Sequence, residues 1–290
     1  MMTNNSSKYT GAVYTPSYIV NNILNFVGYN DSILNKHIID NSCGEGAFLI
    51  EIVKRYVIKY FSINKDPKEL KVQLETYIHG IDYNEESVSN CKYNLDNYCK
   101  QYGLKNIDWD INSGNTLDIN NYDGTMDFVV GNPPYVRVHN LETFYKKVKG
   151  FSFAQNGMTD LYIVFFEIGF NMLNKTGKMG LITPSSFLRS KAGTNLRKAI
   201  SQSKNLIKVI DIGHFQPFNA LTYTMITIFD KSIRSDKIEY FTFDENTLSP
   251  IKIEDLYYDQ VFINKKMYFS SSDDLNFLRN IENYYLLTSR

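Results

Sequence analysis

The sequence has few cysteines, no long apolar run and no net charge. Its three cysteines, Cys43, Cys91 and Cys99, form no Cys-x-x-Cys pair, which excludes a disulfide scaffold and a zinc ribbon and fits a reducing cytoplasm. No apolar run approaches the roughly 18 residues of a membrane-spanning helix, and the first ten residues lack the apolar core of a signal peptide. No cluster of histidine, cysteine or acidic residues has metal-ligand spacing. We therefore expect a cytoplasmic protein without a membrane partner or a bound metal ion.

The absence of net charge is an average over a polarised chain. The 290 residues contain 31 basic and 31 acidic side chains. Residues 1–130 hold 11 basic and 16 acidic residues, residues 131–210 hold 12 and 3, and residues 211–290 hold 8 and 12. The middle region has a net charge of +9 (12 minus 3), and no acid lies between Ile168 and Ile210. Such a region favours contact with nucleic-acid phosphates, although a solvated helix face is the alternative.

The sequence does contain an alternation of strand and helix patterns. Short apolar runs predict strands at residues 37–40, 76–82, 107–111, 126–130, 179–183, 206–212 and 223–229. Helical periodicity predicts helices at residues 17–27, 46–61, 85–102, 160–173 and 272–287. This alternation predicts an α/β fold with a mostly parallel twisted sheet flanked by helices. Ligands of such sheets bind beyond the carboxyl ends of the strands.

The tetrapeptide Asn132-Pro133-Pro134-Tyr135 directly follows the buried strand pattern MDFVVG. The two prolines restrict the backbone and remove two N–H donors, which leaves a stiff corner rich in acceptors. The Asn132 side-chain oxygen and the Pro133 carbonyl can accept both hydrogens of a planar amino group. The Tyr135 ring can stack on the ring that carries this amino group. A proline-rich turn that caps a strand is the bland alternative.

These motifs, in their order along the chain, resemble the gamma-class (TaqI-like) N6-adenine DNA methyltransferases of restriction-modification systems. Tyr14-Thr15-Pro16 resembles the N-terminal cofactor motif of that family, and residues 40–48 (DNSCGEGAF) resemble its glycine-rich loop. Gly80-Ile81-Asp82 resembles its ribose-binding segment. The later segments Asp160-Leu161-Tyr162 and 180–187 (GLITPSSF) follow in the same order. The resemblance implies a Rossmann-like methyltransferase fold over about residues 8–230 and S-adenosyl-L-methionine as cofactor.

The resemblance also implies roles for single residues. It assigns cofactor binding to eight positions: Thr15, Asp40, Cys43, Gly44, Gly46, Asp82, Asn115 and Phe165. It assigns catalysis to Asn132, Pro133, Pro134 and Tyr135. A flipped adenine would lie between Tyr135 and a second aromatic residue, for which Phe218 fits the spacing slightly better than Phe215. Several positions have plainer readings: Thr15 and Asp82 could cap helices, and Asn115 could close a turn.

The basic middle region supplies the expected DNA contacts. They are Arg137, Lys146, Lys147, Arg189, Lys191, Arg197 and Lys198, which would bind phosphates without reading sequence. We expect a catalytic domain over residues 1–245, and a linker with a terminal helix over residues 246–290. That remainder is too short for a full target-recognition domain, so either the sequence is part of a longer chain or a separate specificity subunit supplies recognition, and no nuclease segment is recognised.

Two other functions compete with DNA methylation. NPPY also occurs in enzymes that methylate a glutamine of peptide-release factors, and related corners occur in ribosomal-RNA methyltransferases. The release-factor enzymes carry a helical domain ahead of the cofactor loop, and here that loop begins near residue 40. A non-catalytic DNA-binding subunit of a modification complex is the second competitor, which the intact NPPY and glycine-rich loop disfavour.

Overall fold

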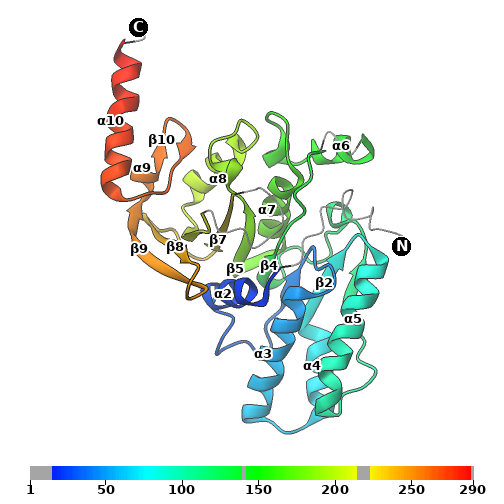
Figure 1. The fold of residues 1–290 in the computed structure, drawn as a ribbon. Coiled ribbons are helices and arrows are strands. Elements are labelled where there is room, and N and C mark those ends of the chain that lie inside the picture. The colour runs from blue at the N-terminus through cyan, green and yellow to red at the C-terminus, as the bar shows by residue number, and fades with distance from the viewer. Residues whose placement is uncertain (1–14, 139–141, 214–222, 289–290) are drawn as a thin grey trace, which may run out of the picture.

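A computed structural model describes residues 15–138, 142–213 and 223–288. Within these residues one sheet has nine strands in the order β3-β2-β1-β4-β5-β7-β6-β8-β9 (Figure 1). The strands are β1 (Ile38–Asp40), β2 (Ile78–Asp82), β3 (Asp110–Ser113), β4 (Met126–Gly131), β5 (Leu173–Pro184), β6 (Leu206–Asp211), β7 (Thr224–Asp230), β8 (Lys237–Asp244) and β9 (Ser249–Tyr257). A small separate sheet pairs β10 (Phe262–Ile263) with β11 (Lys266–Met267).

Helices cover both faces of the sheet (Figure 1). The described helices are α2 (Ser17–Val27), α3 (Ala47–Ile63), α4 (Pro67–Tyr77), α5 (Glu85–Cys99), α6 (Glu142–Val148), α7 (Leu161–Met172), α8 (Thr194–Ser203), α9 (Tyr258–Val261) and α10 (Ser272–Thr288), of which α10 projects away from the sheet. Successive strand residues alternate between the two faces. Phe128 and Val130 join the core under α2, α3 and α5, whereas Val129 joins the core under α7 and α8. The result is a three-layer α/β fold.

The predicted fold class is confirmed by the strand pairing. Strands β3, β2, β1, β4 and β5 run parallel to one another. Antiparallel pairs join β5 to β7, β7 to β6 and β8 to β9, while β6 and β8 are parallel. The predicted helix at residues 17–27 agrees with α2. Helix α4 was not predicted, because its residues 67–77 (PKELKVQLETY) contain few apolar side chains and bury only Leu70 and Leu74.

The C-terminal region differs from the expected linker and helix. Strand β9 pairs along β8 from Lys237↔Tyr257 to Asp244↔Ser249, so the expected boundary at residue 245 falls inside this hairpin. Residues 249–257 therefore belong to the main sheet, and only α10 resembles the expected terminal helix. The strand was missed because its outward side chains, Ile251 and Ile253, are half exposed and interrupted by charged residues.

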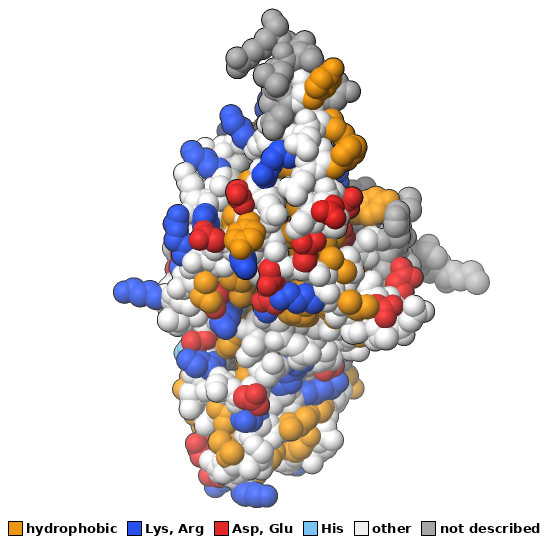
Figure 2. Space-filling view, turned by 90° about the vertical axis from the view of Figure 1, so that its left-hand side faces the viewer, with side chains coloured by type: hydrophobic (Ala, Val, Ile, Leu, Met, Phe, Trp, Pro, Cys, Tyr) orange, Lys and Arg blue, Asp and Glu red, His pale blue; other side chains and the backbone are white. Residues whose placement is uncertain are grey.

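Figure 2 shows the face of the molecule that carries β9 and α10. Lysine, arginine, aspartate and glutamate side chains are interspersed there, with separate hydrophobic side chains between them. Neither positive nor negative side chains dominate this face. Among the described residues, no helix is long and apolar enough to cross a membrane.

Candidate active site

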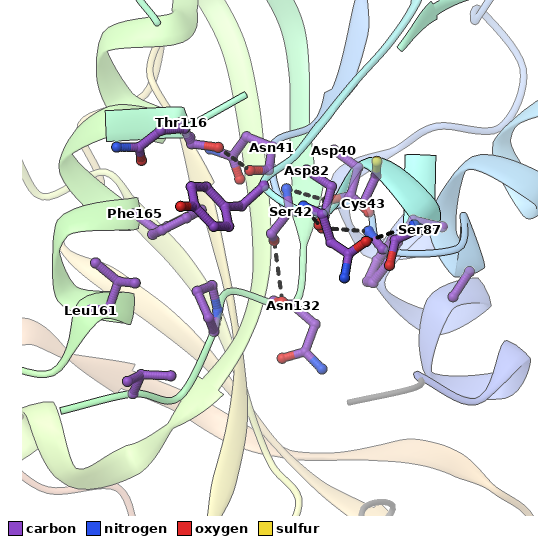
Figure 3. A pocket seen from close by; sticks show the side chains of 18 of the residues that line it. Asp40, Asn41, Ser42, Cys43, Asp82, Ser87, Thr116, Asn132, Leu161 and Phe165 are labelled. Carbon is purple, nitrogen blue, oxygen red and sulfur yellow. Dashed lines mark hydrogen bonds between the residues drawn. The ribbon is translucent and has the colours of Figure 1, made fainter. Parts of the chain in front are cut away.

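A cavity of about 380 Å³ lies where the loops after β1, β2, β3 and β4 converge. Figure 3 shows Asp40, Cys43 and Asp82 on one side of this cavity, Leu161 and Phe165 on the other, and Asn132 at one edge. Parallel strands direct their carboxyl ends to the same edge of a sheet, which is why segments far apart in the sequence line one cavity. The lining combines a few polar groups with an apolar wall, as small-molecule sites do.

The glycine-rich loop after β1 turns sharply into α3. Gly44 and Gly46 have φ values of +51° and +92°, a region that residues with a side chain seldom adopt. A Cβ on Gly46 would lie 2.6 Å from the Cys91 sulfur, so this position excludes any larger residue without a shift of α5. The Gly44 N–H donates to the Asp82 carboxylate at 2.8 Å, which links the loops after β1 and β2.

Asp82 is held by the backbone at the end of β2. One carboxylate oxygen accepts from Gly44, and the other accepts from the Asn84 N–H at 2.9 Å. Asn84, not Asp82, caps helix α5, since its side chain accepts from the Ser87 N–H. The helix-cap reading of Asp82 is therefore wrong. Its oriented carboxylate lines the cavity and retains lone pairs for hydroxyl groups of a ligand.

Asp40 is the buried acid of the cavity, with 1% of its surface exposed. Burial raises its pKa to about 8, with a smaller contribution from the nearby Asp82, and a hydrogen bond from the Ser42 N–H opposes both. Gly131 leaves space for this carboxyl, because a Cβ there would lie 2.7 Å from its Oδ1. A buried carboxyl of this kind favours a cationic partner, which would restore its charged form.

Asn132 is held at its side chain by Thr15 and at its main chain by Ser42, and both of these residues line the cavity. Its Nδ2 donates to the Thr15 hydroxyl at 3.1 Å, and its main-chain carbonyl accepts from the Ser42 hydroxyl at 3.2 Å. Its Oδ1 is buried and has no hydrogen-bond partner within the described residues. An unpaired buried acceptor costs free energy unless a ligand supplies the donor. Asn132 thus presents an acceptor in the absence of ligand.

The Tyr135 side chain is held in place by contacts with β5 and α7. Its hydroxyl donates to the Ile182 carbonyl at 3.2 Å, and its ring packs edge-on against Tyr162 at 6.4 Å between centroids. Tyr162 in turn is hydrogen-bonded to the Ser186 hydroxyl at 2.8 Å. Burial raises the pKa of Tyr135 well above its ordinary value, so the phenol is neutral. The second predicted aromatic, Phe218, and its alternative Phe215 lie outside the described residues.

The remaining predicted cofactor positions also reach the cavity, with different local roles. Phe165 is 5% exposed and forms part of the apolar wall. Cys43 is buried, and its raised thiol pKa, caused chiefly by its contact with Cys91 and by burial, makes it unreactive. Asn115 does close a turn: its side chain accepts from the Leu117 N–H and donates to Asp118. It lines the cavity through a side chain that already has partners.

The predicted DNA contacts divide into exposed and buried groups. Six of them have exposed side chains: Arg137, Lys146, Lys147, Arg189, Lys191 and Lys198. Lys147 forms an ion pair with Asp118, and Arg189 lies over the Tyr268 ring at 5.9 Å. Arg197 was predicted wrongly, because it is 5% exposed and donates to the carbonyls of Phe187, Ser190 and Lys265. It holds the segment after β5 against the β10–β11 turn and has no surface to offer a phosphate.

Sequence reasoning missed several residues that line the cavity. Ser42 and Thr116 contribute hydroxyls, and Tyr83, Leu117 and Phe144 contribute apolar surface. The rings of Tyr83 and Phe144 meet edge to face at 5.9 Å, which joins α6 to the loop after β2. Ser42 was detectable from its place inside the glycine-rich loop. Phe144 carried no local signal, since only folding brings α6 beside that loop.

The strand order, with this cavity at the carboxyl edge of a mostly parallel sheet, identifies the fold. The fold is the Rossmann-like fold of class I S-adenosylmethionine-dependent methyltransferases. A methyltransferase subunit of a type I restriction-modification system from Streptococcus thermophilus superposes with a TM-score of 0.59 at 17% identity. The match covers 96% of this chain and 55% of that one.

Sequence comparison then gives the family. The profile of the Eco57I restriction-modification methylases matches residues 49–218, and the chain belongs to this family. The Type II methyltransferase M.BstVI of Geobacillus stearothermophilus is 30% identical over 256 residues, which cover 80% of this chain and 45% of that protein. The Type II restriction enzyme and methyltransferase RM.Eco57I of Escherichia coli is 29% identical, over 76% of this chain and 28% of that protein. The chain thus spans less than half the length of these relatives.

Proposed function

We propose that the chain is the catalytic part of a site-specific DNA methyltransferase that transfers a methyl group from S-adenosyl-L-methionine to N6 of an adenine. The observation that carries this proposal is the buried Oδ1 of Asn132 at the edge of the cavity, which has no hydrogen-bond partner among the described residues. Family membership supports the reaction class, and the NPPY corner supports an amino group as the acceptor. The three free thiols are consistent with a cytoplasmic protein.

The cavity suits S-adenosylmethionine in size and in the order of its polar groups. Asp82 has an oriented carboxylate for ribose hydroxyls, and Phe165 lies on the apolar wall for a purine ring. Asp40 is a buried acid to which no described residue brings a cation, and the cofactor's ammonium group would ionise it. When bound, the cofactor supplies a methyl group activated on a sulfonium. The residues of the chain bind the cofactor and orient the target amino group.

Asn132 and Pro133 would orient the target amino group. The Asn132 Oδ1 and the Pro133 carbonyl accept one N–H each, which draws the nitrogen from a planar toward a tetrahedral shape and frees its lone pair. Orientation supplies most of the acceleration, and electrostatic stabilisation by the two acceptors adds to it. After transfer the proton leaves to water, since no general base of suitable geometry lies beside Asn132 among the described residues.

An adenine reaches this corner only if it leaves the duplex. The Tyr135 ring supplies one stacking surface, and Phe218 or Phe215 supplies the other. The six exposed basic residues would bind the phosphates on either side. The matches cover only 45% and 28% of the two curated relatives, so DNA sequence recognition would come from a region or a subunit outside these 290 residues.

The test is methyl transfer from labelled S-adenosylmethionine to long mixed-sequence DNA from a methylation-deficient strain, with and without a candidate specificity subunit. Nucleosides are then separated by mass spectrometry. We expect the label in N6-methyladenine. Label in N4-methylcytosine would preserve DNA methylation and reject the adenine assignment, whereas label only in an added release factor would reject the function itself.

A further inference from the structure

The amide of Asn132 has two chemically opposite ends, and only one of them is useful at this corner. If the amide were rotated by 180°, Nδ2 would face the target amino group and two sets of donors would oppose each other. Isolated amides interconvert between these orientations by rotation about χ2, which is a broad torsion. Something in the site has to select the orientation with Oδ1 toward the acceptor nitrogen.

The structure shows one partner that can make this selection. Nδ2 donates to the Thr15 Oγ1 at 3.1 Å, and Thr15 is 2% exposed, so water does not compete for this hydroxyl. The opposite end of the amide, Oδ1, is the buried acceptor to which no described residue donates a hydrogen bond. Thr15 lies just ahead of α2, whereas Asn132 follows β4, and both line the same cavity.

A threonine hydroxyl can donate one hydrogen or accept through its lone pairs. It therefore selects one amide orientation only when its own hydrogen is already donated elsewhere. Because Thr15 lines the cavity, an acceptor atom of a bound cofactor can take this hydrogen. The Thr15 oxygen then faces Asn132 as a pure acceptor, and only Nδ2 fits against it.

We propose that Thr15 is a positioning residue that orients the Asn132 carboxamide, and that occupation of the cavity by the cofactor completes this orientation. The inference rests on the proposed function and adds an order to it: the acceptor for the target amino group is fully set only after the cofactor is bound. Thr15 would thus act through Asn132 in addition to any direct contact with the cofactor.

The contact with Ser42 allows loss of side-chain orientation to be distinguished from a general disruption of the Asn132-Pro133-Pro134-Tyr135 segment. Its hydroxyl donates to the Asn132 main-chain carbonyl at 3.2 Å and so holds the backbone independently of Thr15. Loss of the Thr15 hydroxyl should therefore release the side-chain amide and leave the main chain in place. A structural collapse of the corner would affect both.

The test compares Thr15→Val, which keeps the shape and removes the hydroxyl, with Thr15→Ser, which keeps the hydroxyl. Thr227→Val is the matched control, because Thr227 is a fully buried threonine of β7 that lies outside the cavity lining. At saturating cofactor and DNA, we expect kcat of Thr15→Val to fall about 10- to 100-fold. Thr15→Ser should remain within roughly threefold of wild type, and Thr227→Val should be unchanged.

A second readout follows the amide directly. In protein with ¹⁵N-labelled asparagine, the Asn132 side-chain signal is identified by its absence in Asn132→Ala. Addition of cofactor should slow hydrogen exchange of this signal in wild type and Thr15→Ser but not in Thr15→Val. If Thr15→Val does not fold, Thr15→Ala removes the same hydroxyl with less bulk.

An unchanged kcat in Thr15→Val, an amide signal that responds alike in all variants, or failure of Thr15→Ser to restore activity would each overturn the positioning role. Absence of methyl transfer to DNA by the wild-type protein, with its specificity partner supplied, would instead overturn the proposed function. The amide measurement needs no DNA, so it still tests the positioning role in that event.

Discussion

The loops after β1 and β4 leave neighbouring parallel strands, at paired residues Asp40 and Val130, yet they present opposite hydrogen-bonding groups. The loop after β1 contains Gly44 and Gly46, keeps its backbone N–H groups, and donates one of them to Asp82. The loop after β4 contains two prolines, lacks those donors, and presents an acceptor on Asn132 that has no partner among the described residues. On the proposed function, the same edge of the sheet would place the cofactor against one loop and the target amino group against the other.

The strand ends bring the two loops to the same edge of the sheet. Glycine or proline in each loop then decides whether its backbone offers hydrogen-bond donors or acceptors. The two loops are also in direct contact. Ser42 of the first loop donates to the Asn132 carbonyl of the second, and a Cβ on Gly131 would clash with Asp40. A change in the first loop should therefore appear mainly in cofactor binding, and a change in the second mainly in catalysis.

Removal of the acceptor in the proline-containing loop should have the largest effect. We expect Asn132→Ala to lower kcat for DNA methylation by about 10²- to 10³-fold, because the site loses one preorganised hydrogen-bond acceptor. Cofactor affinity, measured by calorimetry, should change little. Asn90→Ala, at an exposed asparagine of α5, is the matched control. Full activity of Asn132→Ala would mean that the two loops do not divide their roles in this way.

Crowding of the glycine-containing loop should act on stability and cofactor binding together. Gly46→Ala combines a left-handed backbone with a 2.6 Å approach to the Cys91 sulfur, so we expect a loss of about 2–5 kcal/mol in unfolding free energy. Gly103→Ala isolates the backbone part, at about 1–2 kcal/mol, because Gly103 has φ +74° and nothing within 4 Å of a Cβ. Equal losses in both variants, measured by denaturant unfolding, would exclude the steric contribution.

A second substitution identifies the atom that causes the crowding. Cys91→Ala added to Gly46→Ala removes the sulfur and should recover part of the stability and cofactor affinity. If stability does not recover, the destabilisation by Gly46→Ala comes from the backbone conformation alone.

The buried acid of the first loop should make stability depend on pH. The folded-state pKa of Asp40 is about 8, above the unfolded value near 3.9, so its contribution is present below about pH 4 and is lost as pH rises toward 8. The expected slope reaches ~1.4 kcal/mol per pH unit. In Asp40→Asn this part of the slope should vanish, which denaturant unfolding between pH 4 and 8 can measure. Asp31→Asn, at an exposed acid, should keep the wild-type slope.

The smallest effect should come from the exposed lysines of α6. Removal of one phosphate-binding charge lowers the slope of log Kd against log salt concentration by about 1. We expect Lys146→Gln to show this change and Lys147→Gln to show less, since Lys147 already pairs with Asp118. Equal salt effects for the two lysines would mean that the ion pair with Asp118 does not weaken the phosphate contact of Lys147.

Arg197 is the buried counterpart of these lysines. Arg197→Gln should leave the salt slope unchanged and lower stability, because this buried guanidinium bonds to carbonyls and a threonine hydroxyl. A reduced salt slope in Arg197→Gln, with stability unchanged, would contradict its structural role.

Much of the fold was predictable because it depends on local periodicity. The helix at residues 17–27 and the buried strand at 126–131 can be recognised from their own residues alone. Helix α4 and strand β9 escaped because one is mostly polar and the other has an exposed face. Their stability comes from docking against α3 and pairing with β8, contacts that a local pattern does not contain.

The candidate site shows the same division between chain and fold. Residue types and their order already indicated a glycine-rich cofactor loop, a ribose-binding acid and an acceptor corner, since glycine, aspartate and Asn-Pro-Pro act through their own backbone and side-chain chemistry. Only the folded chain places Thr15 against Asn132, turns Asn115 back onto its own loop and buries Arg197. Burial and partnership are properties of distant residues brought together, so they decide whether a side chain of suitable chemistry is available to a ligand.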